Sequence, residues 1–298
     1  MQKADASSEG DPDLVYRDDF SGSRDRAEVS RLLQDTFGLD LAPLDELGLG
    51  DPSYRAFSYF DAAGSCVANA ATFVLPLVVG GRRVNAIGVQ SVATRPAHRG
   101  RGLSRRLLGH ALRWCDANAD LVFLMTSIPG FYEPLGFRTV PQFAYVGVPP
   151  PTQLAAPGRL LDLGLGDDRR LLAELLRRRS PVSAHFAVVG AAGDVVLNLM
   201  GEPELCAWHL PAHDAVVVTR QMQDDTFCLV DIVAAEMPEL AQILASLDVQ
   251  PRRVEVHFPS DRLAWSGSAA LAETRTILMV RGNAGPLPPF MLPETAGF

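Results

Sequence analysis

Apolar runs of the length of a β-strand recur through the first half of the chain. Two longer stretches, residues 66–79 and 82–94, are separated by Gly80-Gly81 and therefore predict a long hairpin. The other expected strands are residues 15–20, 54–60, 121–127 and 138–147. Helical spacing predicts helices at residues 25–37 and 103–118, and a short helical or irregular segment at 39–49. This order of elements indicates a mixed sheet flanked by helices.

The pattern is interrupted by three consecutive prolines, Pro149 to Pro151, which cannot continue a strand ladder and form a stiff linker. Beyond them a similar plan follows, with helices at 168–178 and 238–247 and strands at 185–189, 204–209, 215–220, 227–233, 253–258 and 276–281. We therefore expect a disordered leader at residues 1–13, a first domain at 14–149 and a second domain at 150–298.

One turn in the first half carries candidate chemistry. The strand ending at Thr94 leads through Arg99-Gly100-Arg101-Gly102 into the helix that begins at Leu103. Glycines allow a ligand close to the backbone, and a helix N-terminus directs unpaired N–H groups and the positive dipole end to one place. Arg99, Arg101, Arg105 and Arg106 add positive charge. The turn therefore predicts a pyrophosphate-binding site.

Two common nucleotide motifs do not fit this turn. No Gly-Lys-Ser/Thr follows it, as a Walker loop would require. The dinucleotide motif Gly-x-Gly-x-x-Gly is also absent, because Arg105 stands three positions after Gly102. Nucleoside triphosphates and NAD are thus disfavoured ligands.

The segment from Arg99 to Ser104 resembles the Arg/Gln-x-x-Gly-x-Gly/Ala signature of the GNAT family of acyl-coenzyme A N-acyltransferases, with Ser104 in the last position as a small departure. Residues 130–137, Gly-Phe-Tyr-Glu-Pro-Leu-Gly-Phe, are similar to the second signature of that family. The resemblance implies an α/β (α+β mixed-sheet) GNAT fold in the first half. The second half, which lacks the turn, resembles a degenerate GNAT-like copy, an arrangement similar to the first two domains of Eis-like acetyltransferases.

The resemblance also implies the cofactor, acetyl-CoA, and a set of site residues. Tyr132 would be the general acid that protonates the departing thiolate, although a buried core role is the alternative for this residue. The two splayed strands around the turn would hold the pantetheine arm between residues 90–94 and 124–127. The residues expected to contact the cofactor are Val92, Ala93, Thr94, Arg99, Gly100, Arg101, Gly102, Leu103 and Ser104. The amides of the first three would stabilise the oxyanion.

The general base cannot be assigned from a motif. Candidates are Glu133, Asp61, Glu46 and the terminal carboxylate of Phe298, each of which is also a plausible surface charge. Phe298 is kept as a second catalytic candidate, because the resemblance to Eis-like enzymes implies a C-terminal carboxylate at the active site and the apolar, proline-rich tail could dock near Tyr132. The expected reaction is acetyl transfer to a primary amine by direct attack, and the alternative is a non-catalytic acyl-CoA-binding or regulatory module.

Composition narrows the classes of partner. The 298 residues are 47% hydrophobic and 21% charged, which suffices for two cores. A net charge of −8 argues against nucleic acid. No membrane span or export signal is evident, so we expect a cytoplasmic protein without a membrane partner, acting on a small-molecule or peptide amine. Homo-oligomer formation is left open.

The cysteines and histidines show no metal-binding spacing. Cys66, Cys115, Cys206 and Cys228 form no Cys-x-x-Cys pair, and each lies in an apolar stretch. His209 and His213 have a metal-like gap, but the proline between them argues against a pair of ligands on one helix. We therefore expect reduced, buried thiols and no metal ligand.

Overall fold

The computed structural model describes residues 13–18 and 23–298. The predicted leader, residues 1–13, lies outside the described residues except for Asp13. By their contacts the residues form two compact units, and β3 and β4 run through both. The first unit comprises the described residues up to Asp40, Tyr54–Thr72 and Ser91–Ala117, and the second comprises Leu41–Ser53, Phe73–Gln90 and Asn118–Phe298.

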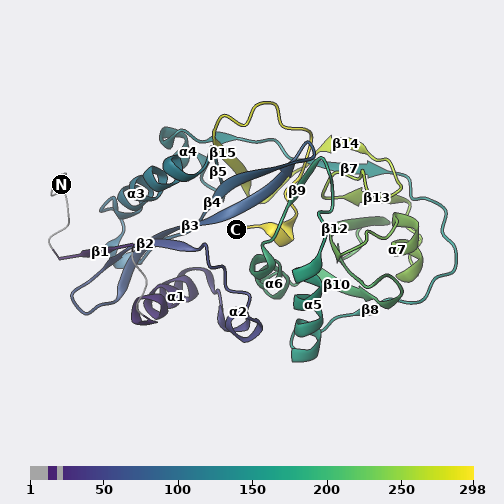
Figure 1. Ribbon diagram of the computed structural model, residues 1–298, viewed down its shortest axis with the longest axis horizontal. Helices are drawn as coiled ribbons and strands as arrows, with labels where there is room; N and C mark the ends of the chain where they lie inside the picture. The colour runs from purple at the N-terminus through teal and green to yellow at the C-terminus, as the bar shows by residue number, and fades with distance from the viewer. Residues whose placement is uncertain (1–12, 19–22) are drawn as a thin grey trace. The chain divides into compact units, whose positions relative to one another are not determined.

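Helices are interspersed among groups of strands along the described chain (Figure 1). The helices are α1 (Ser23–Phe37), α2 (Ala42–Leu47), α3 (Leu103–Asn118), α4 (Pro129–Tyr132), α5 (Gly166–Arg178), α6 (Ala192–Gly201) and α7 (Leu240–Ser246). The strands are β1 (Val15–Arg17), β2 (Arg55–Phe60), β3 (Cys66–Val79), β4 (Arg82–Thr94), β5 (Leu121–Thr126), β6 (Arg138–Thr139), β7 (Phe143–Gly147), β8 (Arg159–Leu160), β9 (Phe186–Val188), β10 (Leu205–Leu210), β11 (Ala215–Arg220), β12 (Thr226–Ala234), β13 (Arg253–Val256), β14 (Ser268–Leu271) and β15 (Ile277–Gly282).

The first unit is built on antiparallel strands. β1 pairs with β2, and β2 pairs with the first half of β3. The apolar face of α3 is buried in the way that its helical spacing predicts, with Leu103, Leu107, Leu108, Ala111, Leu112 and Cys115 all inaccessible or nearly so. A helix packed over its whole length has a fixed starting point, and this fixes the turn before it.

The second unit continues the sheet with both strand directions. β4 pairs in parallel with β5 over Ala86–Val89 and Leu121–Leu124, and the ladder ends there although both strands continue. The other edge of β5 pairs along its whole length with β15, which comes from the end of the chain. β6 pairs with β15, and β9 pairs with the end of β3. The sheet is therefore mixed.

A second sheet in the same unit has the strand order β14-β7-β13-β12-β11-β10-β8. Alternate residues of its strands enter different cores because successive side chains point to opposite faces. Val217 and Leu229 pack with Ile243 of α7, whereas Val216 and Val230 pack with helices α5 and α6. One helix thus covers one face and two helices cover the other (Figure 1).

Most predicted elements are present, and several differ. The predicted strand at 138–147 is divided into β6 and β7, in different sheets, because Pro141 between them has no N–H for a ladder. Helix α6 and strand β14 were not predicted. The predicted boundary near residue 150 also does not coincide with the sheets: β7, before it, joins the second sheet, and β15, after it, joins the first.

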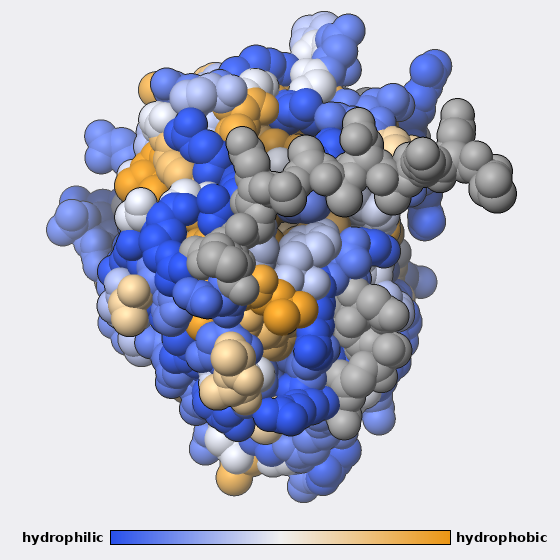
Figure 2. All heavy atoms as spheres, turned by 90° about the vertical axis from the view of Figure 1, so that its left-hand side faces the viewer, coloured by the Kyte–Doolittle hydropathy of each residue, from blue (hydrophilic) through white to orange (hydrophobic). Residues whose placement is uncertain are grey.

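The surface seen from the left-hand side of Figure 1 is mainly hydrophilic, with small hydrophobic areas among the polar side chains (Figure 2). None of the helices in the described part of the chain has the length and apolar character needed to cross a bilayer.

Candidate active site

The predicted phosphate-binding turn lies between β4 and α3. After a short 3-10 turn at Pro96–His98, Gly100 and Gly102 adopt left-handed φ angles of 76° and 71°. A Cβ placed on either glycine would meet no heavy atom of the described residues within 4 Å. The backbone here therefore borders open space, in a conformation that glycine adopts without strain.

Helix α3 presents its first amides at this turn. The first hydrogen bond of the helix runs from the Arg106 N–H to the Gly102 carbonyl, at 3.1 Å. The N–H groups of residues 103–105 therefore have no carbonyl partner within the helix. The hydroxyls of Thr94 and Ser104 are hydrogen-bonded at 2.7 Å, which ties the end of β4 to the first turn of α3. Amides outside the ladder and a positive dipole end are the features by which helix N-termini bind phosphates.

The four arginines expected around the turn have different surroundings. Arg99 is exposed and its Nε donates to the Thr94 carbonyl at 3.2 Å. Arg101 and Arg105 are exposed beside the turn. Arg106 instead lies over the ring of Tyr59, 5.8 Å from its centroid, so it packs α3 against β2. Its expected contribution to the positive charge at the turn stays a prediction.

Near its end, β4 contains a residue with an unusual backbone conformation that the sequence did not predict. Ser91 has a left-handed φ of 56°. Its carbonyl accepts a hydrogen bond from Nδ2 of the fully buried Asn69 at 2.8 Å, and Oδ1 of Asn69 accepts one from the Ser58 hydroxyl at 2.6 Å. This left-handed residue directly precedes Val92, Ala93 and Thr94. The oxyanion role of these three amides stays a prediction.

Tyr132 ends α4 and is followed by the single turn Glu133–Leu135 and by Gly136, whose φ is 88°. Its ring is buried and packs edge-on against Phe131 and Phe137, with centroids 5.0 and 6.1 Å away. Burial raises the pKa of the Tyr132 hydroxyl above its ordinary value of 10.0. The phenol is therefore protonated at neutral pH and is able to act as an acid.

Phe298 lies in the second unit, where its ring packs edge-on against Phe73 at a centroid distance of 5.0 Å. Nδ2 of Asn198 in α6 donates to the carbonyls of Thr295 and Gly297, at 3.1 and 2.8 Å. The tail is thus held by both polar and apolar contacts. A catalytic role for the Phe298 carboxylate stays a prediction.

Two of the acidic base candidates have structural partners. Glu46 forms an ion pair with Arg169 at 2.9 Å, and Asp61 accepts the Ser65 N–H at 2.8 Å in the turn between β2 and β3. A carboxyl that the sequence analysis missed is Asp194, in the first turn of α6. Burial, with a smaller contribution from Asp51, raises the pKa of Asp194 to about 7. Its sequence signal was weak because α6 itself was not predicted.

Comparison with known proteins assigns the fold. Residues 43–140 match the family described as acetyltransferase (GNAT) domain. Eis1 from Mycobacterium abscessus is 19% identical, with a TM-score of 0.56 over 90% of this chain and 73% of that one. A GCN5-related N-acetyltransferase from Anabaena variabilis is 13% identical, with a TM-score of 0.53 over 90% of this chain and 72% of that one. A search of curated protein sequences gave no match. Residues 43–140 are therefore similar to a GNAT acetyltransferase domain, and the chain shares the fold of these solved structures.

Proposed function

We propose that this protein is an acetyl-CoA-dependent N-acetyltransferase that acetylates a primary amine of a small molecule or peptide by direct attack. The observation that carries the proposal is the turn at residues 99–104. It combines two left-handed glycines facing open space with the first amides of a buried helix, inside the segment that matches the acetyltransferase family. That combination fits a diphosphate group such as that of coenzyme A.

In the proposed mechanism the amides of residues 102–105 and the side chains of Arg99, Arg101 and Arg105 bind the diphosphate. Acetyl-CoA, when bound, supplies the thioester carbon that the amine attacks. The amides of Val92, Ala93 and Thr94 stabilise the negative charge on the carbonyl oxygen. The Tyr132 hydroxyl donates its proton to the departing sulfur, and its raised pKa keeps that proton in place until then.

The test uses the full chain with acetyl-CoA and a panel of polyamines, aminoglycosides, amino acids and peptides, with products followed by mass spectrometry. We expect one class of amine to gain an acetyl group. Coenzyme A binding measured by calorimetry, without acetylation of any amine in the panel, would instead identify a binding or regulatory module. If coenzyme A did not bind at all, residues 99–104 would not be its binding site.

The acid role of Tyr132 has its own test. Tyr132→Phe should keep coenzyme A binding and lower turnover by about 10²- to 10⁴-fold, which is the usual contribution of a general acid. Tyr145→Phe is the matched control, because Tyr145 is a partly buried tyrosine of the second sheet whose hydroxyl donates to the Pro289 carbonyl. If Tyr132→Phe turned over substrate as fast as Tyr145→Phe, Tyr132 would have only a packing role.

A further inference from the structure

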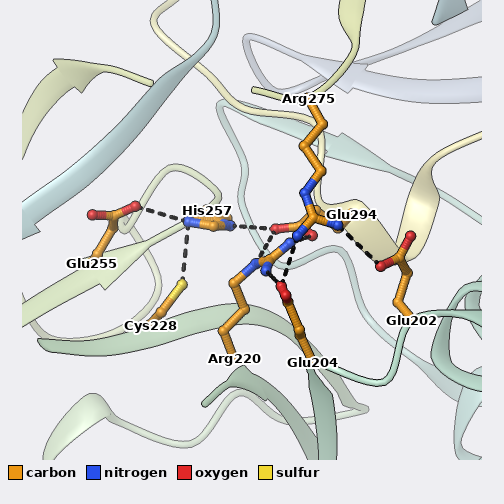
Figure 3. A network of polar contacts seen from close by, with 8 residues as sticks. All are labelled: Glu202, Glu204, Arg220, Cys228, Glu255, His257, Arg275 and Glu294. Carbon is orange, nitrogen blue, oxygen red and sulfur yellow. Dashed lines mark hydrogen bonds and ion pairs between the residues drawn. The ribbon is translucent and has the colours of Figure 1, made fainter. Parts of the chain in front are cut away.

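A group of polar side chains in the second sheet is unrelated to the residues discussed so far. Cys228 of β12 and Glu255 of β13 are direct partners in a parallel ladder. His257 follows β13, and its N–H donates to the Leu229 carbonyl at 2.9 Å, so it continues the same ladder. Side chains two positions apart on a strand point to one face. Glu255 and His257 therefore share a face, and Cys228 lies beside them (Figure 3).

The three side chains bring a sulfur, a nitrogen and an oxygen together. His257 Nε2 lies 3.2 Å from Cys228 Sγ and 3.0 Å from Glu255 Oε1. All three atoms lie within 4.8 Å of one another, and within residues 13–18 and 23–298 this is the single such group of three. Around a tetrahedral zinc ion with bonds of about 2.0–2.3 Å, neighbouring ligand atoms are about 3.3–3.8 Å apart. Small shifts would thus accommodate an ion.

The other nitrogen of the imidazole faces a carboxylate. His257 Nδ1 is 3.4 Å from Glu294 Oε1, on the side away from Cys228 and Glu255 (Figure 3). It makes no hydrogen bond of good geometry within the described residues. Glu294 is held by Arg220, whose Nε donates to Oε1 at 2.9 Å and whose guanidinium also contacts Oε2. A carboxylate behind a histidine is the usual partner that orients a metal-binding imidazole.

Burial and charge agree with a bound cation. The His257 side chain is only 6% exposed, whereas Glu255 is 32% exposed and Cys228 is partly exposed, so an ion could enter from their side. A bound thiolate and carboxylate supply two negative charges, which a divalent ion balances while the imidazole stays neutral.

We propose that Cys228, Glu255 and His257 bind a divalent metal ion of the zinc class, with a fourth position open to water and with Glu294 as a positioning residue behind His257. Sulfur, imidazole and carboxylate together suit zinc, whereas magnesium and calcium prefer oxygen ligands alone. The ion would join β12 to the end of β13. Through Glu294 it would also support the C-terminal segment. This site is independent of the acetyl transfer proposed above.

The test starts from the full chain after dialysis against a chelator. Titration with Zn²⁺ should show one ion per chain and raise the melting temperature. Titration with Co²⁺ should give the visible bands of a tetrahedral site and a thiolate-to-metal absorption in the near ultraviolet. No tight binding, or saturation far from one ion per chain, would overturn the proposal.

Variants separate this site from chance binding. Cys228→Ser should abolish the thiolate absorption and weaken Zn²⁺ binding by more than about tenfold. Cys206→Ser is the matched control, because Cys206 is also partly exposed on a strand of the same sheet but lies outside the group, and it should bind like the wild type. Equal Co²⁺ spectra for both variants would overturn the proposal. So would an imidazolium signal for His257 by nuclear magnetic resonance that persists in excess Zn²⁺.

The positioning role of Glu294 is tested by Glu294→Gln. This variant should keep the thiolate absorption and weaken binding by about 10- to 100-fold, the usual effect of replacing an orienting carboxylate. A purely structural loss would lower the melting temperature without changing the affinity of the metal. That result would remove Glu294 from the site.

Discussion

At the proposed cofactor site, Gly100 and Gly102 show how strongly a single residue can affect coenzyme A binding. Their left-handed backbone places amides, with no side chain, beside open space. Gly102→Asp should weaken coenzyme A binding more than about tenfold, because a carboxylate would stand beside the diphosphate and like charges repel by several kcal/mol. Binding is measured by calorimetry, and circular dichroism should show an unchanged fold.

Gly38→Asp is the control for that change. Gly38 also has a φ of 71°, a Cβ placed on it would meet no heavy atom of the described chain within 4 Å, and it follows helix α1 in the same unit. The control therefore introduces the same backbone strain and the same charge away from the turn. If the two variants bound coenzyme A equally well, residues 99–104 would not be the diphosphate site.

Asp194 predicts a pH dependence of stability. Its carboxyl keeps a proton up to about pH 7 in the folded protein, whereas an aspartate in the unfolded chain loses its proton near pH 3.9. Between these values the folded state binds more protons than the unfolded state. The free energy of unfolding therefore falls as pH rises from about 4 to about 7, and the loss is complete above that range.

Asp194→Asn should remove this part of the pH dependence and raise the free energy of unfolding at pH 8 by about 1–3 kcal/mol, with little change at pH 4. Urea unfolding at the two pH values measures it. Asp167→Asn, in the first turn of α5 and with an exposed side chain, should lack this effect. A similar gain for both variants would mean that burial of Asp194 is not the cause.

At this scale the sequence predicts what is local. The turn at 99–104 and Tyr132 belong to short motifs whose residues are neighbours in the chain. Ser91 carries no such signal, because its left-handed backbone is held by Asn69 from another strand. In the sequence Asp194 looks like an ordinary acidic residue at a helix start, because only the fold partly buries it and raises the pKa of its carboxyl.

At the scale of elements, strand-length apolar runs and helical spacing predicted the hairpin of β3 and β4 and the bounds of α3. Helix α6 was not predicted, because its first turn contains Gly193 and its centre contains the β-branched residues Val195 and Val196. All three lower the helix propensity of the segment. The proposed metal site could not be found from spacing either. Cys228 and His257 are 29 positions apart and meet only because β12 and β13 pair.

A close approach between β4 and β3 gives a stability prediction. A Cβ on Gly88 would lie 2.1 Å from Cε1 of Phe73, a contact that real side chains do not make. Gly88→Ala should therefore lower the free energy of unfolding by about 1–3 kcal/mol, the usual cost of overpacking. Urea denaturation measures the change.

Two further variants make that prediction specific. Adding Phe73→Leu to Gly88→Ala should return part of the lost stability, because the smaller side chain gives room for the methyl group. Gly109→Ala, in the middle of α3 and with only the end of Arg113 near its Cβ, should be neutral or stabilising by up to about 1 kcal/mol. A loss of stability in Gly109→Ala equal to that in Gly88→Ala would contradict the packing argument.

For the whole molecule, the fold class followed from the order of elements, but the assignment of strands to sheets did not. β15 pairs with β5, although the two strands are separated in sequence by more than half the length of the chain. β7 pairs in the second sheet, although β6, the strand just before it, pairs in the first. Local patterning says that a segment is a strand and gives no information on which edge it joins. The prolines after Val148 predicted a linker between two domains, yet the chain returns to the first sheet after them.

This return predicts that residues 13–149 do not fold alone, although they contain the whole segment that matches the acetyltransferase family. Without β15, the apolar strand β5 would expose its edge, and such edges promote aggregation. Leu278, Met279 and Val280, all buried, would also be missing from the core. The fragment should lack a cooperative thermal transition, and co-expression with residues 150–298 should restore one. A monomeric fragment that unfolds cooperatively by itself would show that the first domain is complete without the C-terminal strand.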